Sequence, residues 1–183
     1  MTATSPPRFR LAPRTRKLVL LLHVITSVGW LGIHLGNIMF VLTGLLTTDP
    51  GTQRTAFLAV DLLGGMVLIP ISLLSFTTGV VLGLGTKWGL VRNWWVLTKF
   101  VLTLVPVILI PLSLLPGYTD LADAVTAAPD GTLADVGEHG TSMVGAAVVS
   151  TTMYVTSAVL SIFKPWGRTR WGKRQPARVV AAA

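Results

Sequence analysis

The chain has 183 residues, of which 51% are hydrophobic and only 12% are charged. Soluble domains carry roughly 25% charged residues, so this composition excludes a conventional soluble domain and indicates a single membrane domain. The net charge is +8, but the basic residues flank the apolar runs and form no nucleic-acid-binding motif. We therefore expect no nucleic-acid partner. The absence of cysteine excludes disulfides, thiolate catalysis and cysteine-based metal sites.

Four apolar runs follow one another along the chain. A proline-containing basic arm, residues 1–16, precedes a membrane domain over residues 17–166, and a basic tail covers residues 167–183. Each run is long enough to cross ~30 Å of hydrocarbon as a helix, and the first is too long for the apolar core of a signal peptide. The fold class is therefore all-α, a four-helix transmembrane bundle, with spans at residues 18–46, 56–84, 94–115 and 141–163.

The loops between the spans alternate in charge. Basic residues lie before the first span, between the second and third, and after the fourth. Residues 116–140 contain aspartate and glutamate but no lysine or arginine. Because basic loops stay on the cytoplasmic side, we expect a plasma-membrane protein with both termini cytoplasmic. Five tryptophans at the same boundary are typical of an interfacial belt in contact with the lipid bilayer: Trp88, Trp94, Trp95, Trp166 and Trp171.

Features within the spans suggest their packing. Pro70, Pro106 and Pro111 should kink the second and third spans, and a short helix is expected over residues 120–128 of the acidic loop. On the first span, Gly29, Gly32 and Gly36 share one side, where we expect close packing against another helix. The opposite side carries a polar stripe that should face the bundle interior: His23, Ser27, Trp30, His34 and Asn37.

Ionisable side chains inside the runs indicate candidate sites. His23 and Lys99 lie one to two helical turns inside the cytoplasmic boundary and can be neighbours, whereas Asp61 and His139 belong near the outer boundary. An inner His/Lys site and an outer Asp/His site are both compatible with these depths, with buried His34 between them. The alternatives are structural: Lys99 and His23 as interfacial residues, Asp61 as a helix cap, and His34 hydrogen-bonded to a neighbouring span.

Two segments carry a resemblance. HVITSVGWLGIHLG at residues 23–36 and LSFTTGVVLGLGTKWGLVRNWWVLTKFVLTL at residues 74–104 resemble an uncharacterised actinobacterial family of predicted four-span integral membrane proteins. More distantly, His-x6-Trp-x-Gly followed by Trp-x3-Lys is similar to the membrane domain of copper-resistance proteins and to HemJ-type protoporphyrinogen oxidases. The latter resemblance implies a haem-ligand histidine, here His23, and a functional lysine, here Lys99.

Three functions stay open from the sequence. The first is an accessory or small-molecule-handling role with a buried His/Lys site, whose partner is a second copy of the chain or another membrane protein. The second is binding of haem b or a porphyrin, with His23 as the metal ligand, Lys99 on a propionate and Trp30 against the macrocycle. The third is a carrier for a metal ion, proton or small solute. No nucleophile–base pair or phosphate loop indicates an enzyme.

Overall fold

The fold is known from a computed structural model that describes residues 10–173. The described part of the chain is helical and contains no strand. Four continuous stretches, Pro13–Leu46, Pro50–Gly85, Trp94–Ala127 and Gly137–Phe163, are long and apolar enough to cross a membrane. The predicted all-α bundle of four spans is confirmed, and the chain is a multi-pass membrane protein.

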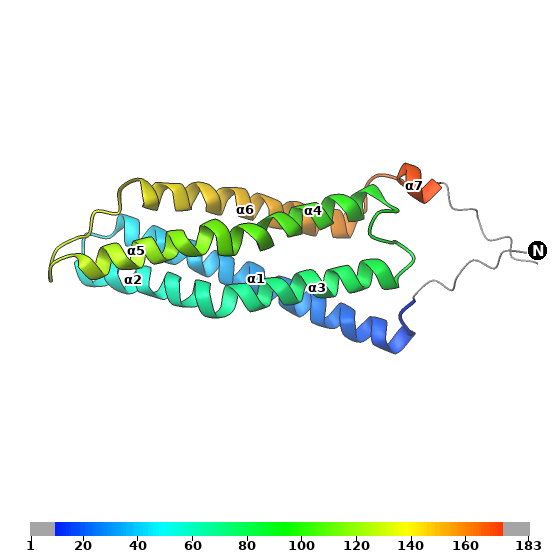
Figure 1. The fold of residues 1–183 in the computed structure, drawn as a ribbon, viewed down its shortest axis with the longest axis horizontal. Coiled ribbons are helices and arrows are strands. Elements are labelled where there is room, and N and C mark those ends of the chain that lie inside the picture. Colours follow the sequence, from blue (N-terminus) through cyan, green and yellow to red (C-terminus); the bar gives the residue numbers. More distant parts are fainter. Residues whose placement is uncertain (1–9, 174–183) are drawn as a thin grey trace, which may run out of the picture.

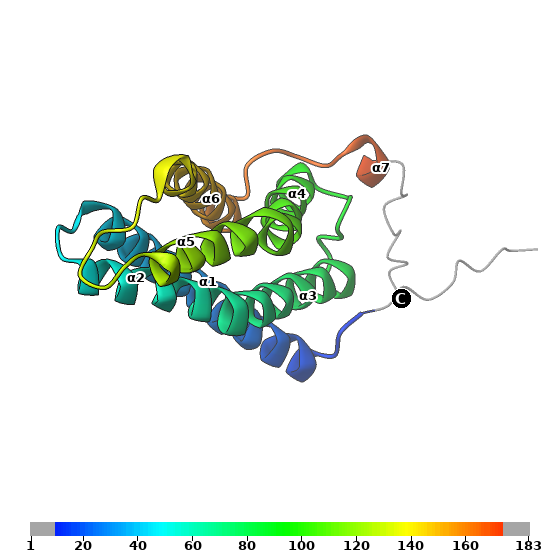
Figure 2. The ribbon, with the colours of Figure 1, turned by 60° about the vertical axis from the view of Figure 1, so that its left-hand side comes forward.

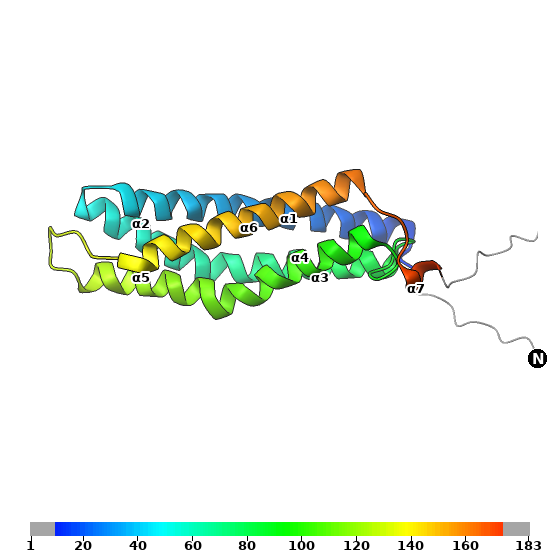
Figure 3. The same cartoon turned by 90° about the horizontal axis from the view of Figure 1, so that it is seen from above.

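The four spans lie side by side along the long axis of the molecule (Figures 1 and 3). The loops at residues 47–49 and 128–136 meet at one end, which we call the acidic end, and residues 86–93 meet the short helix α7 at the other, the basic end. Figure 2 shows α7 set apart from the bundle. The elements are α1 (Pro13–Leu46), α2 (Pro50–Leu63), η1 (Gly64–Leu68), α3 (Ile69–Gly85), α4 (Trp94–Leu109), η2 (Ile110–Leu114), α5 (Leu115–Ala127), α6 (Gly137–Phe163) and α7 (Arg170–Lys173).

Several helices extend beyond the apolar runs. α1 begins at Pro13, inside the expected arm, because proline at the first helical position loses no hydrogen bond. The second span begins at Pro50 behind Asp49, whose carboxylate accepts hydrogen bonds from the Thr52 N–H at 2.8 Å and hydroxyl at 2.6 Å. These bonds hold the pKa of Asp49 below its ordinary value. The expected separate helix at residues 120–128 is instead the continuous end of the third span, α5.

The prolines coincide with widened helical turns. The π-helical turn η1 ends two residues before Pro70, and η2 contains Pro111, whereas Pro106 lies inside the regular helix α4. Proline lacks an N–H and its ring clashes with the carbonyl four residues earlier. A wider turn relieves that clash.

Glycines decide which spans come closest. A Cβ atom on Gly44 would lie 2.6–2.9 Å from the ring of Phe57, and one on Gly64 would lie 2.7 Å from the ring of Tyr118. The expected glycine side of α1 packs only partly: Gly29 faces Ile71, but nothing in the described chain lies within 4 Å of a Cβ on Gly32 or Gly36. The prediction that all three glycines pack against another span of the chain is therefore wrong, because the neighbouring spans approach α1 from its polar side.

This packing makes Gly44→Ala destabilising. The added methyl would overlap a fully buried Phe57 ring, so one of the two must shift, and the free energy of unfolding should fall by about 1–3 kcal/mol. Gly36→Ala is the matched control on the same helix and should cause no loss. Denaturant unfolding of the purified variants measures both, and equal stabilities would contradict the close Gly44–Phe57 contact.

Candidate ligand-binding site

A cavity of about 680 Å³ opens between α1, α3, α4 and α6 at the basic end. Its volume lies within the ~300–1,000 Å³ range of small-molecule sites. Five basic side chains line it, and no acidic side chain of residues 10–173 does: Arg10, Arg16, Lys87, Lys99 and Lys164. Phe76, Trp88, Trp95 and Phe100 supply aromatic walls. The cavity therefore combines uncompensated positive charge with apolar surface.

His23 enters this cavity from α1 in a defined orientation. Its Nδ1 lies 3.0 Å from the Ser75 carbonyl oxygen and 3.1 Å from the Thr78 hydroxyl. That hydroxyl donates its proton to the carbonyls of its own helix, at 2.7 Å for Leu74, so Nδ1 must be the donor. The Nε2 atom then carries the lone pair and makes no hydrogen bond within residues 10–173. Such an imidazole has the orientation and tautomer of a ligand-binding histidine.

A glycine on α3 makes room for this ring. A Cβ atom on Gly79 would lie 3.0 Å from His23 Cε1, which is tighter than ordinary contact. The hydroxyl of Ser27, one turn along α1, lies 2.8 Å from the Ser75 hydroxyl. α1 and α3 are thus joined by a row of polar contacts that holds the imidazole at the cavity wall.

Lys99 reaches the same cavity from the opposite side. Its Nζ donates to Ser161 Oγ at 2.6 Å, and Ser161 Oγ donates to the Ser157 carbonyl at 2.8 Å. An ammonium has three donors, and this is the one hydrogen bond of Lys99 Nζ in the described chain. Two donors are left for a ligand. The structure thus brings the two predicted residues of the inner site, His23 and Lys99, to one cavity.

Segments outside the apolar runs complete the rim. The Leu11 N–H donates to the Gly85 carbonyl at 3.1 Å, and this bond ties the start of the chain to the end of α3. The indole of Trp88 lies edge-on to Trp95, with ring centroids 5.3 Å apart, and under the ammonium of Lys87 at 5.1 Å. The sequence predicted only an interfacial belt for these tryptophans; no local spacing signals that two of them line a site.

The tail after α6 is anchored to the loop at residues 86–93. The Thr169 N–H donates to the Arg92 carbonyl at 2.9 Å, and the Thr169 hydroxyl donates to the Val91 carbonyl at 2.6 Å. Asn93 and Arg168 form an isolated antiparallel bridge. Residues 167–173 of the expected tail therefore belong to the folded basic end; residues 174–183 lie outside the described part.

Other predicted residues lie away from the cavity. Trp30 is buried against Tyr154, with ring centroids 4.9 Å apart, and does not line the cavity. His34 Nε2 lies 3.1 Å from the Thr151 hydroxyl, which matches the alternative of a histidine bonded to a neighbouring span. The position of Trp30 follows from its angle on α1, which points it at α6 instead of α3.

The outer pair is not formed. Asp61 accepts a hydrogen bond from the Thr119 hydroxyl at 2.8 Å, and His139 lies 3.4 Å from Asp120 instead. No group of three or more His, Cys, Asp or Glu side chains in residues 10–173 could hold a metal ion. The predicted pair of Asp61 and His139 is therefore not formed: residues of α5 contact each of them instead, Thr119 at Asp61 and Asp120 at His139.

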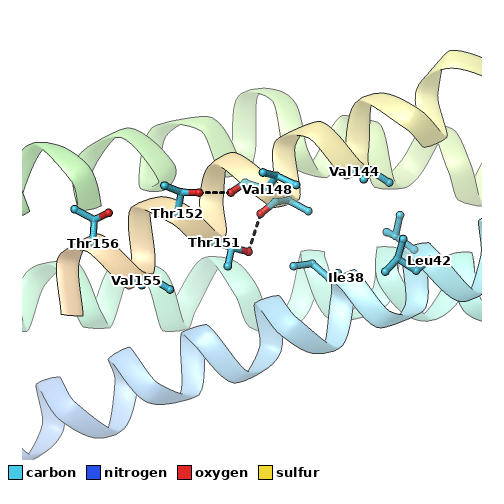
Figure 4. A pocket seen from close by; sticks show the side chains of 10 residues that line it. Ile38, Leu42, Val144, Val148, Thr151, Thr152, Val155 and Thr156 are labelled. Atoms are coloured by element: carbon cyan, nitrogen blue, oxygen red, sulfur yellow. Dashed lines mark hydrogen bonds between the residues drawn. The ribbon is translucent and has the colours of Figure 1, made fainter. Parts of the chain in front are cut away.

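A second hollow of about 480 Å³ faces outward between α1 and α6. Figure 4 shows its walls, Ile38 and Leu42 from α1 and Val144, Val148 and Val155 from α6. Two threonine hydroxyls of this wall bond to their own helix: Thr151 donates to the Ala147 carbonyl at 2.8 Å and Thr152 to the Val148 carbonyl at 2.9 Å. The hollow offers mainly apolar contact, and no charged side chain of residues 10–173 lines it.

The chain matches no protein-family model, no curated protein and no solved structure. The resemblance to the actinobacterial membrane family, to the copper-resistance domain and to the HemJ-type oxidases therefore stays a prediction.

The contrast between the two hollows gives a test by cysteine reactivity, which is clean because the chain has no cysteine. Thr103 lines the basic cavity and Thr152 the outward hollow, and both hydroxyls bond to the carbonyl four residues earlier at 2.9 Å. A thiol reacts as the thiolate, which needs water. Thr103→Cys should therefore react with a charged thiosulfonate, and faster with an anionic than with a cationic reagent, whereas Thr152→Cys should stay unmodified. Equal labelling would contradict a hydrated cationic cavity.

Proposed function

We propose that this membrane protein binds an anionic amphiphilic small molecule in the cavity at its basic end. The observation that carries the proposal is the lining: five basic side chains, aromatic walls and no carboxylate of the described chain around one space of about 680 Å³. In a medium of low dielectric constant, several unpaired cations repel one another unless an anion compensates them. The aromatic walls favour a ligand whose body is apolar. This supports the small-molecule-handling role.

Haem b, or a related porphyrin, is the ligand that uses all features of the site. The free Nε2 of His23 would be the axial nitrogen, and its Nδ1 bond to the Ser75 carbonyl fixes the ring as expected of a haem-ligand histidine. The ammonium groups of Lys99 and Lys164 would pair with the propionates, because carboxylates form strong charge-assisted hydrogen bonds with ammonium groups. The aromatic contact assigned to Trp30 falls instead to Trp88 and Trp95, which line the cavity. Bound haem supplies redox or ligand-binding chemistry at its iron.

The charge distribution supports a plasma-membrane location with the basic end on the cytoplasmic side. Lys87, Arg92, Lys164 and Arg168 lie at this end, and the residues of the opposite loops, 47–49 and 128–136, include only acidic charges. Both termini would then be cytoplasmic. The ligand would enter from the cytoplasm or from the inner leaflet, whose anionic lipids also favour this orientation.

Single cysteines test the orientation. Asp130→Cys should be labelled by a membrane-impermeant maleimide in intact cells, whereas Ala183→Cys should be labelled only after the membrane is opened. Each cysteine is the only thiol in its variant. If both positions react from the same side, the four-span arrangement with cytoplasmic termini is incorrect.

The visible spectrum tests the ligand. Wild-type protein expressed with ample haem should show a Soret band, and His23→Ala should lose it. Lys99→Ala should keep a Soret band but release haem faster, because a propionate contact retains the ligand without coordinating iron. His34→Ala is the matched control, since His34 is bonded to Thr151 away from the cavity, and a folded His34→Ala variant should keep the band.

The outcome separates haem from other anions. A colourless wild type that quenches or enhances its tryptophan fluorescence when metal-free protoporphyrin is added would keep the porphyrin and remove the iron. A wild type that binds neither compound, while Thr103→Cys still reacts preferentially with the anionic reagent, would remove the tetrapyrrole and leave an anionic amphiphile of another class. If the wild type binds neither compound and Thr103→Cys shows no preference for the anionic reagent, the proposed function is overturned.

A further inference from the structure

Buried polar groups without partners lie at the centre of the bundle, away from the cavity. The indole Nε1 of Trp30, both amide atoms of Asn37 and the hydroxyl of Ser157 have no hydrogen-bond partner in the described chain. These side chains are 2%, 1% and 7% exposed. Each buried polar group left unpaired costs about 1–3 kcal/mol, and membrane interiors offer no bulk water to offset it. Native structures satisfy such groups with protein or with bound water.

The unpaired groups converge from different spans. Trp30 meets the ring of Tyr154 from α6 at a centroid distance of 4.9 Å, with the two planes at 74°. The Asn37 amide, two turns further along α1, lies next to the Tyr118 side chain of α5. We call Trp30, Asn37, Tyr118, Tyr154 and Ser157 the polar core. It offers N–H, O–H and C=O groups and no charge.

The polar core adjoins the basic cavity on one side. Ser157 lies one helical turn from Ser161, which lines the cavity and donates to the Ser157 carbonyl, and Tyr154 follows on the same face of α6. Polar groups therefore continue along α6 from the cavity to the centre of the bundle. Toward the acidic end, fully buried apolar side chains close the bundle: Phe57, Val60 and Leu121 are at most 1% exposed.

We propose that the polar core binds ordered water molecules that are continuous with the water of the basic cavity and are sealed from the acidic end. A buried water needs two to four polar partners, which the mixture of donors and acceptors in the polar core provides. Wide turns flank the site: Gly64, the first residue of η1, packs against the Tyr118 ring, and π-helical turns are frequent at functional positions. The proposal stands whichever ligand the basic cavity binds.

Hydroxyl-radical footprinting by X-ray radiolysis tests this inference, because radicals form from bound water and label side chains next to it. The full chain is reconstituted in lipid nanodiscs in ¹⁸O-water, and labelling is normalised to the denatured protein. Trp30 should be labelled although it is buried, and half-buried Tyr154 with it, whereas Phe57, an aromatic residue as buried as Trp30 but in the apolar seal, should stay unlabelled. Labelling of Trp30 no higher than that of Phe57 would overturn the proposal.

Substitution of Asn37 gives a second measurement. Asn37→Leu keeps the size of the side chain and removes both amide groups, so labelling of Trp30 should fall several-fold, and thermal stability should fall because the water loses its partners. Ser157→Ala is a smaller change and serves if Asn37→Leu fails to fold. It should reduce the labelling of Tyr154. A dry polar core predicts the opposite, because removing an unpaired amide from an apolar interior raises stability. A higher melting temperature with unchanged labelling would refute the bound water.

Discussion

The constraint on which this structure depends is that polar groups cannot face hydrocarbon without a partner. It turns the polar stripe of α1 inward, so that His23 and Ser27 meet α3, and His34 meets α6. Hydroxyls, imidazoles and a carbonyl thus join α1 to α3 and α6 beside the apolar contacts. A helix of this length with only apolar residues would have no preferred rotation about its axis. The buried hydrogen bonds give α1 one rotation, and that rotation places His23 at the cavity.

The same constraint divides the bundle into layers along its axis. Toward the acidic end Phe57, Val60 and Leu121 are buried, and the Phe57 ring packs against Gly44. At the centre lie polar side chains that are buried without protein partners. At the basic end the spans separate around a cationic cavity. The tightest packing and the basic cavity are thus at opposite ends of the same four helices.

Charge distinguishes the cavity from the outward hollow between α1 and α6. The two spaces have volumes of about 680 and 480 Å³, and the walls of the second are mainly valine, isoleucine, leucine and threonine. Such a surface suits acyl chains or another apolar helix and selects neither. The basic cavity differs in its polar groups, because His23 has a free ring nitrogen there and Lys99 a directed ammonium. Positive charge in the cavity can also raise the local concentration of an anionic ligand.

The sequence by itself determined the class of fold. In a bilayer, the backbone N–H and C=O groups of an apolar run find hydrogen-bond partners only in a helix or a closed barrel, and the length of the four runs fits helices. It also determined that His23 and Lys99 lie at a common depth, since 1.5 Å per residue converts position in a span into depth. A helix was predicted over residues 120–128, but its continuity with the third span was not, because Pro116 and Gly117 precede it in the sequence and mark a break there.

Only the tertiary structure decided which residues share a site. Depth does not give the rotation of one span against another, so Trp30 was expected beside His23 although it packs on Tyr154, and Asp61 and His139 were expected as neighbours although residues of α5 contact each of them instead. The tautomer of His23 likewise depends on a carbonyl 52 residues away. Periodicity within a helix shows which side chains share a face; the partner of that face is set by contacts between distant segments, which no local pattern records.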